Sequence, residues 1–442
     1  MNKPSVKYAN TIEYVVQKGL CTGCGTCVGI CPRDAVEIVI DQHKGIYAPT
    51  IQWDKCNECG LCFQVCPGPS VDFNHLNQEI FGKKPVNILL GNYLNCYIGH
   101  ATDYEIRYNS ASGGIVTALL VFALEEGLIN GALVTRMRED RPLEPEPFIA
   151  RTKEEVISAA RSKYCPVPAN IALKEIIKAK DGERFAVVGL PCHIHGIRKT
   201  EFVNKNLKNK IVLHLGIFCG RAPSFLGTEF LLKRMGLRKD EVKQINYRGE
   251  GWPGSMSLEL TNNKKVSITL SQYYNDKFTA FSLYRCVLCS DASADLADIS
   301  FADAWGLSED KIGKSIIISR NTLGQNVLNR MVLQQNIAIA KINAGEVAHK
   351  SVANKKKKGV KARFRIFRLG GKLPAYNQDL PKPNITAYLA AIYLYMRMFL
   401  ASKRYLWGLL NISVDLFTQL LNMSNRIKSL LRILHTRRNV IG

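Results

Sequence analysis

Eight cysteines between residues 21 and 66 fall into two identical runs that could bind iron–sulfur clusters. The first run is Cys21, Cys24, Cys27 and Cys31, followed by Pro32, and the second is Cys56, Cys59, Cys62 and Cys66, followed by Pro67. Each run reads C-x2-C-x2-C-x3-C-P, a spacing typical of thiolate ligands to cubane 4Fe-4S clusters. Disulfide and zinc sites do not use two tandem four-cysteine runs with matching prolines. The sequence therefore predicts two 4Fe-4S clusters.

The order of the cysteines also predicts which thiolates share a cluster. With this spacing, the first three cysteines of a run hold one cubane and the fourth reaches across to the other. One predicted ligand set is Cys21, Cys24, Cys27 and Cys66. The other predicted set is Cys56, Cys59, Cys62 and Cys31. A chain that holds two such clusters carries electrons.

A third group of thiols follows later in the chain. Segments 187–192 and 215–220 each read as a buried strand that ends at a cysteine, where ligands usually sit in α/β sheets. Together with a C-x2-C pair, these cysteines supply four thiols: Cys192, Cys219, Cys286 and Cys289. Four thiols suffice for one more 4Fe-4S cluster, and spacing alone leaves zinc as an alternative. Cys96 and Cys165 are predicted core residues, with a reactive thiol beside Lys163 as the alternative for Cys165.

The elements between these cysteines predict how the chain positions them. Short strands at 36–40 and 46–51 fit a small two-cluster module of two similar halves. Apolar runs at 131–135, 185–189, 211–218 and 315–319 alternate with helical patterns, which predicts an α/β body with a largely parallel sheet. Ser112, Gly113 and Gly114 precede a strongly apolar helix that starts at Ile115. Such a helix start either binds a phosphate or is a plain capped helix with close packing.

Most of the net charge of +23 belongs to the end of the chain. Residues 350–442 contain nineteen Lys and Arg against two acids, a net charge of +17. The fourteen cysteines in cluster-type spacing predict a reducing, cytoplasmic compartment, and the first twenty residues lack a signal-peptide pattern. We find no zinc-finger or RNA-binding signature, so nucleic acid is not an expected partner.

The body resembles the beta subunit family of coenzyme F-420 hydrogenase and dehydrogenase over about residues 95–320. The motifs that carry the resemblance are 112–119, Ser162-Lys163-Tyr164, 190–192 with 196–199, 216–219, Cys286-x2-Cys289-x-Asp291 and 297–300. The resemblance implies an FAD beside a 4Fe-4S cluster and electron transfer to an organic acceptor. It implies that Ser112, Gly113 and Gly114 hold the FAD phosphate and that Ser162, Lys163 and Tyr164 lie near the flavin, although the triplet also suits a surface helix end. It assigns Cys192, Cys219, Cys286 and Cys289 to the cluster.

The chain departs from the hydrogenase subunit in carrying the twin cysteine runs. We therefore expect it to accept electrons itself from a ferredoxin-like donor and pass them through the clusters to FAD. The acceptor would be an F-420-type deazaflavin or another small or lipid-linked molecule, with Arg248, Trp252, Asp303 and Trp305 as candidate neighbours or plain structural turns. The alternative is an electron-transfer subunit without its own substrate, which relays electrons to a partner enzyme.

The expected fold is an α+β ferredoxin-like domain, an α/β flavoprotein domain and a basic helical tail. The predicted limits are 1–75 for the two-cluster domain, 90–180 and 181–345 for the N-terminal-type and C-terminal-type regions of the family, and 350–442 for the tail. In the tail, a basic run at 355–368 precedes an apolar helix at 385–401, with a further apolar helix expected at 406–434. Helix 385–401 is short for a membrane span. The tail either lies on the inner face of a membrane or forms a helical pair packed on the body or on a partner.

Overall fold

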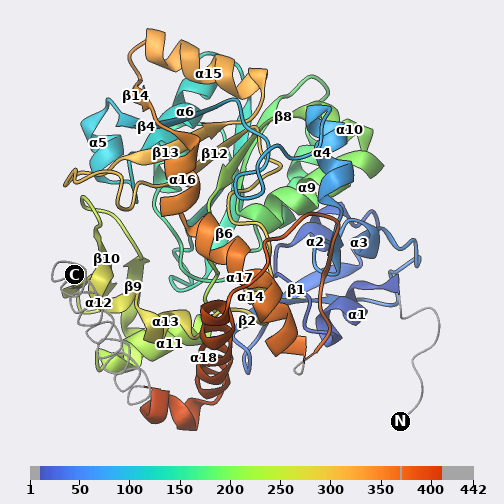
Figure 1. Ribbon diagram of the computed structural model, residues 1–442, viewed down its shortest axis with the longest axis vertical. Helices are drawn as coiled ribbons and strands as arrows, with labels where there is room; N and C mark the ends of the chain where they lie inside the picture. The colour runs from blue at the N-terminus through green and yellow to red at the C-terminus, as the bar shows by residue number, and fades with distance from the viewer. Residues whose placement is uncertain (1–9, 369–370, 411–442) are drawn as a thin grey trace, which may run out of the picture.

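The computed structural model describes residues 10–368 and 371–410, apart from the side chains of Asp276 and Lys277. An eight-stranded sheet forms the centre of the body, in the order β14-β4-β13-β12-β8-β7-β5-β6 (Figure 1). Its strands are β4 Asn95–Ala101, β5 Gly131–Met137, β6 Pro145–Ala150, β7 Phe185–Gly189, β8 Ile211–Ile217, β12 Ile299–Asp303, β13 Ser315–Ser319 and β14 Ile337–Lys341. The predicted strands at 131–135, 185–189, 211–218 and 315–319 are confirmed.

The central sheet is mixed, so the expectation of a largely parallel sheet is wrong at its edges. β5, β7, β8 and β12 run parallel to one another. β6 at one edge, and β13, β4 and β14 at the other, pair antiparallel to their neighbours. A short loop without a helix joins β12 to β13, and such a connection can only join antiparallel strands.

Side chains of the sheet pack into three cores, two of which share β5 while the third includes residues of β4 and β13. Ala132 and Val134 of β5 pack into the core that contains α6 and α15, whereas Leu133 packs into the core that contains α4, α8, α9 and α10. This alternation is the period of two that any strand has. The covering helices are α4 Phe73–Phe81, α5 Tyr104–Tyr108, α6 Ile115–Glu125, α7 Lys153–Ser158, α8 Leu173–Lys178, α9 Pro191–Val203, α10 Lys205–Lys210, α15 Thr322–Leu333 and α16 Ala344–Lys350.

The N-terminal module packs beside this body (Figure 1). It consists of α1 Ile12–Gln17, α2 Thr26–Ile30, an antiparallel hairpin of β1 Val36–Asp41 and β2 Ile46–Ile51, and α3 Leu61–Gln64. α2 and α3 each begin after a glycine with a left-handed backbone, Gly25 at φ 82° and Gly60 at φ 75°. The two halves therefore repeat the same turn into a short helix, as the paired cysteine runs predict.

A third part, which the sequence did not predict, is a small antiparallel sheet with short helices. Its elements are β9 Val242–Asn246, β10 Ser255–Leu260, β11 Lys265–Thr269, α11 Phe225–Arg234, α12 Leu270–Tyr273, α13 Asp276–Thr279 and α14 Tyr284–Val287. The C-terminal part adds α17 Val352–Phe367, α18 Ile385–Ala401 and the short strand β15 Ala375–Tyr376, which pairs with β3 Ser70–Val71. The predicted helix at 385–401 is confirmed, and the helix expected at 406–434 lies mostly outside the described residues.

Candidate functional site

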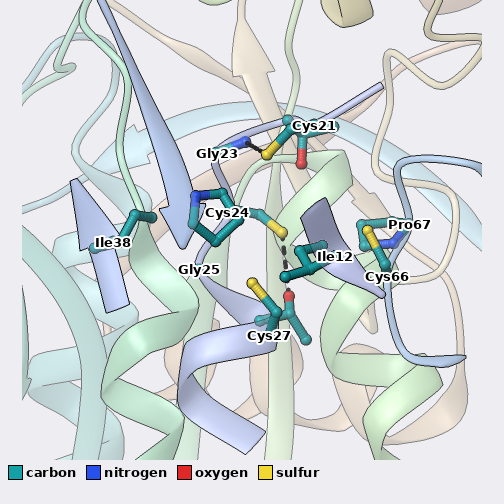
Figure 2. A pocket seen from close by; sticks show the side chains of 12 residues that line it. Ile12, Cys21, Gly23, Cys24, Gly25, Cys27, Ile38, Cys66 and Pro67 are labelled. Carbon is teal, nitrogen blue, oxygen red and sulfur yellow. Dashed lines mark hydrogen bonds between the residues drawn. The ribbon is translucent and has the colours of Figure 1, made fainter. Parts of the chain in front are cut away.

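The first thiol group consists of Cys21, Cys24, Cys27 and Cys66, which line one pocket. Figure 2 shows their sulfur atoms turned toward a common space. Cys27 lies on α2, whereas Cys66 comes from the second cysteine run, just after α3. Two backbone N–H groups point at these sulfurs: Gly23 donates to Cys21 Sγ at 3.3 Å and Gly68 donates to Cys66 Sγ at 3.4 Å. The last cysteine of the second run thus joins the first three of the first run.

The second thiol group consists of Cys31, Cys56, Cys59 and Cys62, which line a cavity of about 430 Å³. Its sulfurs also accept backbone N–H groups, from Ala35 to Cys31 Sγ at 3.3 Å and from Glu58 to Cys56 Sγ at 3.4 Å. Cys59 is exposed, so this group is the one nearest to solvent.

The chemistry of these groups fits cubane clusters. Burial raises the pKa of the Cys21 thiol to about 12. Burial and the neighbouring thiols likewise raise the pKa of Cys27 and of Cys66. Coordination to a metal deprotonates such a thiol outright. Among the residues that the structure describes, no three His, Cys, Asp or Glu side chains close on a point that a single metal ion could fill. Four thiols around one pocket, with N–H groups aimed at sulfur, form the ligand shell that a 4Fe-4S cluster needs.

The third thiol group consists of Cys192, Cys219, Cys286 and Cys289. Cys192 is the second residue of α9, directly after β7, and Cys219 follows the end of β8. Burial raises the pKa of Cys192 most, and the thiols of Cys24, Cys286, Cys219 and Cys289 raise it further. Cys24 belongs to the first thiol group, so the first group acts electrostatically on Cys192 of the third.

Asn170 fastens the module to the body next to Cys24. Its backbone N–H donates to Cys24 O at 2.9 Å, and its Nδ2 donates to Thr26 Oγ1 at 2.8 Å. A Cβ atom at Gly29 would lie 2.1 Å from Asn170 O, and one at Gly196 would lie 2.1 Å from Thr26 Oγ1. Glycine at position 29 therefore lets α2 approach residues 169–173, and glycine at position 196 lets α2 approach α9, the helix that carries Cys192. Nothing in the sequence pattern of these residues signalled this contact.

The predicted acceptor residues Arg248, Trp252, Asp303 and Trp305 come together in one site, which we call the acceptor site. Arg248 Nη1 and Asp303 Oδ2 are 2.5 Å apart, and Trp305 Nε1 donates to the same oxygen at 3.1 Å. The rings of Trp252 and Trp305 lie 4.5 Å apart between centroids, with the Arg248 guanidinium 5.2 Å from the Trp252 centroid. Trp305 is 48% exposed, whereas Arg248 is 1% exposed.

One atom of the acceptor site lacks a partner. Arg248 Nε donates to Pro253 O at 3.1 Å, and Nη1 is bound to Asp303. Nη2 is buried without a hydrogen-bond partner among the described residues. A buried unpaired N–H is costly, so this donor is suited to a ligand oxygen.

Two tyrosines connect the acceptor site with the third thiol group. Arg248 Nη1 also donates to Tyr164 OH at 3.3 Å, and the Tyr164 ring lies 4.6 Å from the Tyr274 ring between centroids. Burial, then Tyr164, then the Cys219 thiol raise the pKa of Tyr274, so the third thiol group acts electrostatically on this ring. Tyr274 was not predicted, because the pair Tyr273-Tyr274 matches no motif of a functional site.

The six residues that the family resemblance assigns to FAD are not all available to it. Ser112 Oγ donates to Lys314 O at 2.7 Å, and Gly113 N–H donates to Ser315 Oγ at 2.9 Å. Gly114, at φ 77°, is the N-cap residue of α6. The first turn of α6 still has N–H groups without intrahelical partners. A phosphate at this helix start would therefore rely on those groups rather than on Ser112 or Gly113.

The Ser162-Lys163-Tyr164 triplet divides between two roles. Lys163 Nζ donates to the carbonyls of Ala159, at 2.5 Å, and Ala160, at 2.7 Å, and so caps the C-terminal end of α7. Burial lowers the pKa of Lys163 to about 7. Tyr164 instead joins the acceptor site through Arg248.

Cys96 and Cys165 stand apart from the three thiol groups. Both side chains are buried, at 4% and 2% exposure. Burial raises the pKa of Cys96 to about 11 and that of Cys165 to about 12, although Lys163 partly opposes the shift at Cys165. A protonated, buried thiol is a core residue rather than a reactive one.

The basic run at 355–368 is not simply a solvated face. It forms most of α17, and Lys356 and Lys357 on this helix are buried. Lys356 Nζ donates to Cys219 O at 2.9 Å, and Lys357 Nζ lies 2.5 Å from Asp295 Oδ2. Charge counting cannot distinguish such inward lysines from solvated ones. This part of the tail is therefore packed on the body, next to the third thiol group.

Comparisons with known proteins agree with this geometry. Residues 96–174 and 182–345 match the family models of the N-terminal and C-terminal parts of the coenzyme F-420 hydrogenase/dehydrogenase beta subunit. The beta subunit of coenzyme F-420 hydrogenase from Methanothermobacter thermautotrophicus is 30% identical over 250 residues, 55% of this chain and 83% of the relative. The chain belongs to this family. Residues 20–68 also match a 4Fe-4S dicluster domain, so the chain is an iron–sulfur member of the family.

Two further similarities extend beyond the shared body. The coenzyme F-420-dependent sulfite reductase of Methanocaldococcus jannaschii is 26% identical over 351 residues, which are 76% of this chain and 50% of that protein. A chain of the F-420-reducing [NiFe] hydrogenase complex from Methanosarcina barkeri has a similar fold, with a TM-score of 0.52 and 23% identity. That likeness covers 67% of this chain and 98% of the other. Helix α17 begins at Val352, after the last residue matched by the family models.

Proposed function

We propose that this chain is an oxidoreductase subunit that carries electrons from a ferredoxin-like donor to an organic acceptor. The observation that supports this most directly is the series of three thiol groups. Gly196 of α9, the helix that carries Cys192, lies against Thr26 of the module, and Cys24 acts electrostatically on Cys192. Cys219 acts in the same way on Tyr274, whose ring lies 4.6 Å from that of Tyr164 at the acceptor site. Electrons would enter at the exposed second group, pass through the first and third groups, and leave at Arg248. The reductive chemistry and the cysteine spacing suit a cytoplasmic location.

The proposed division of the chain follows the predicted limits with one change. Residues 1–75 receive electrons, and residues 90–180 and 181–345 form the body with the acceptor site. Within residues 350–442, we now propose binding to a membrane surface only for α18. Helix α17 is assigned instead to the enclosure of the third thiol group, because Lys356 contacts Cys219 there.

The acceptor site is the place where we propose that FAD binds. A bound flavin supplies the conversion between one-electron and two-electron transfer. Arg248 Nη2 is positioned to donate to a carbonyl or anionic oxygen, and Trp252 and Trp305 offer aromatic surface to a planar ring. The final acceptor would be an F-420-type deazaflavin or another small or lipid-linked molecule.

The second candidate is a relay subunit that passes electrons to a partner enzyme and has no substrate of its own. It is supported by the relatives, several of which are named as subunits of hydrogenases or dehydrogenases. A relay subunit needs the three thiol groups but no ligand for Arg248. The buried, unpartnered Nη2 atom is the observation that favours the first candidate.

Cofactor content separates the two candidates. We would purify the full chain without oxygen and measure iron, acid-labile sulfide and released flavin per chain. About twelve irons with one FAD would support the reductase, and about eight irons without flavin would restrict the chemistry to the N-terminal module. Arg248→Met should lower flavin content, whereas the control Arg136→Met, which removes a half-exposed surface arginine, should not. Equal flavin in both variants would refute the assignment of Arg248.

A membrane surface is the partner that we propose for α18. Among the described residues, no single helix is long and apolar enough to cross a membrane. One pair of consecutive helices, Ile385–Ala401 and Arg404–Leu410, reaches that length and apolarity together, but the two are bent by 112° relative to each other. On α18 a stripe of exposed apolar side chains recurs every three or four residues: Ile385, Leu389, Ile392, Met396 and Phe399. Exposed cations flank it at Lys382 and Lys403, which complements an anionic lipid surface.

Vesicle binding tests this partner. The full chain should co-sediment with anionic vesicles more than with neutral ones, and Leu389→Gln with Met396→Gln should abolish the difference. The control is Leu333→Gln, which alters an 82% exposed leucine on α15. Equal sedimentation of wild type and the α18 variant would refute a lipid partner for this stripe.

A further inference from the structure

Two buried cations, Lys356 and Arg285, and the half-buried Lys199 lie beside the first and third thiol groups. Lys356 Nζ donates to Cys219 O at 2.9 Å, and Lys199 Nζ donates to Cys66 O at 2.6 Å. Arg285 Nε donates to Gly68 O at 2.7 Å. Among the described residues, no carboxylate oxygen lies within 4.0 Å of these three cationic groups, in contrast to the Lys357–Asp295 pair. Each cation thus bonds a backbone carbonyl of a cysteine or of a residue close to one.

A buried charge without a countercharge is unstable. Removing a charged group from water costs several kcal/mol unless another charge compensates it. Lys356 is only 7% exposed, and the thiols of Cys289, Cys219 and Cys286, followed by Asp291, act on it most strongly. Asp291 is already paired with His195, at 2.8 Å. A cluster with four thiolate ligands would place further negative charge beside Lys356. The position of Lys356 is therefore explained if the third thiol group holds such a cluster.

We propose that Lys356 raises the reduction potential of a 4Fe-4S cluster held by Cys192, Cys219, Cys286 and Cys289. The net charge around a cluster is one of the factors that set its potential, and a nearby positive charge favours the reduced, more negative form. The reduced cluster gains one electron and no bond changes. This inference rests on the proposed function, because it requires the third cluster. It concerns a helix that lies outside the residues matched by the family models.

Contacts of other residues hold α17 in place, so the charge of Lys356 can be removed without displacing the helix. Lys357 is held by Asp295, and Arg363 donates to Val287 O at 2.5 Å and to Lys356 O at 2.6 Å. Lys357 and Arg363 anchor α17 on the C-terminal side of Lys356, and Ala353 on its N-terminal side is buried in a core with strand residues of the body. None of these contacts uses the Lys356 ammonium group. Replacing that ammonium should therefore change the local charge and leave the helix in place.

The test is a redox titration, monitored by electron paramagnetic resonance, of the full chain purified without oxygen. Lys356→Met should make one-electron reduction of the third cluster about tenfold less favourable, a shift of about 59 mV to lower potential. Lys356→Arg keeps the charge and should keep the wild-type potential. Lys355→Met, which neutralises an exposed lysine on the same helix, is the matched control.

An unchanged potential in Lys356→Met, or the same shift in Lys355→Met, would overturn the inference. If Lys356→Met loses iron, Lys356→Gln serves as the second variant, because its amide can still donate to Cys219 O without a charge. An unchanged potential in that variant would equally overturn it. The iron content of the wild type distinguishes failure of the proposed third cluster from failure of the proposed role of Lys356. About eight irons would overturn the third cluster and the inference together, whereas about twelve irons with no shift would overturn the role of Lys356 alone.

Discussion

Removing cysteines in pairs tests the arrangement of the N-terminal clusters. The structure places Cys66 with Cys21, and not with Cys56 of its own run. Cys21→Ala with Cys66→Ala should therefore remove two ligands from one cluster. Cys56→Ala with Cys66→Ala should remove one ligand from each of two clusters. Both variants lose two thiols, so they differ only in how the losses are distributed.

The expected magnitude follows from four irons per cluster. From about twelve irons in the wild type, the Cys21 and Cys66 variant should retain about eight, and the Cys56 and Cys66 variant should retain about four. Iron and sulfide analysis gives the totals, and paramagnetic resonance of the reduced protein shows whether one or two cluster signals change. Even if a cluster survives with three ligands, two signals change in the second variant and one in the first.

The opposite result would refute the crossed arrangement. If the Cys56 and Cys66 variant loses one cluster while the Cys21 and Cys66 variant loses two, each run binds its own cluster. Cys96→Ala and Cys165→Ala are the controls, because these buried cysteines lie outside all three thiol groups. Loss of iron in either control would mean that damage to the fold, and not loss of a ligand, explains the measurements.

Three further predictions concern the body. Gly196→Ala places a Cβ atom against Thr26, so it should slow electron transfer between module and body at unchanged iron content; an unchanged rate in stopped-flow reduction would contradict this. Asp298→Asn removes one of the two buried carboxylates that Arg198 and His214 share, the other being Glu201, so unfolding should become easier by about 1.5–3 kcal/mol in urea titrations, and a loss below about 0.5 kcal/mol would contradict this. Burial lowers the pKa of Lys163 to about 7 in the folded chain, against about 10.4 in the unfolded chain, so between these values the unfolded chain binds more protons and the free energy of unfolding rises with pH. Lys163→Met should flatten that rise, and an identical profile of stability against pH would contradict the shift.

Local signals in the sequence predicted the parts of the site that depend on local spacing. The cysteine runs predicted two groups of four thiols, and the structure brings the same cysteines into two pockets. That they bind clusters stays a prediction. The strand that precedes Cys192 and the helix Ile385–Ala401 were also predictable, because hydrophobic runs and capping residues are close in sequence to the elements they define.

Contacts between distant segments were not predictable in the same way. Arg248 meets Tyr164 and Asp303, which are 84 and 55 residues away in the chain. Arg248 lies between β9 and β10 of the small sheet, which was not predicted although Ser255–Leu260 alternates polar and apolar residues. Arg248 and Asp303 were predicted as neighbours of the acceptor, with plain structural turns as the alternative, and the unpartnered Nη2 atom could be seen only in three dimensions.

The C-terminal segment shows why a charge count gave an incomplete interpretation. A net charge of +17 over residues 350–442 suggested one basic tail that could be removed as a unit. Instead, Lys356 contacts Cys219 and β15 pairs with β3 of the N-terminal region, so this segment connects body and module. Deleting residues 350–442 would therefore uncover the third thiol group as well as remove the apolar stripe of α18. A loss of membrane binding in such a deletion would not identify its cause. Substitutions on the exposed face of α18 separate the two roles, because they leave α17 and β15 unchanged.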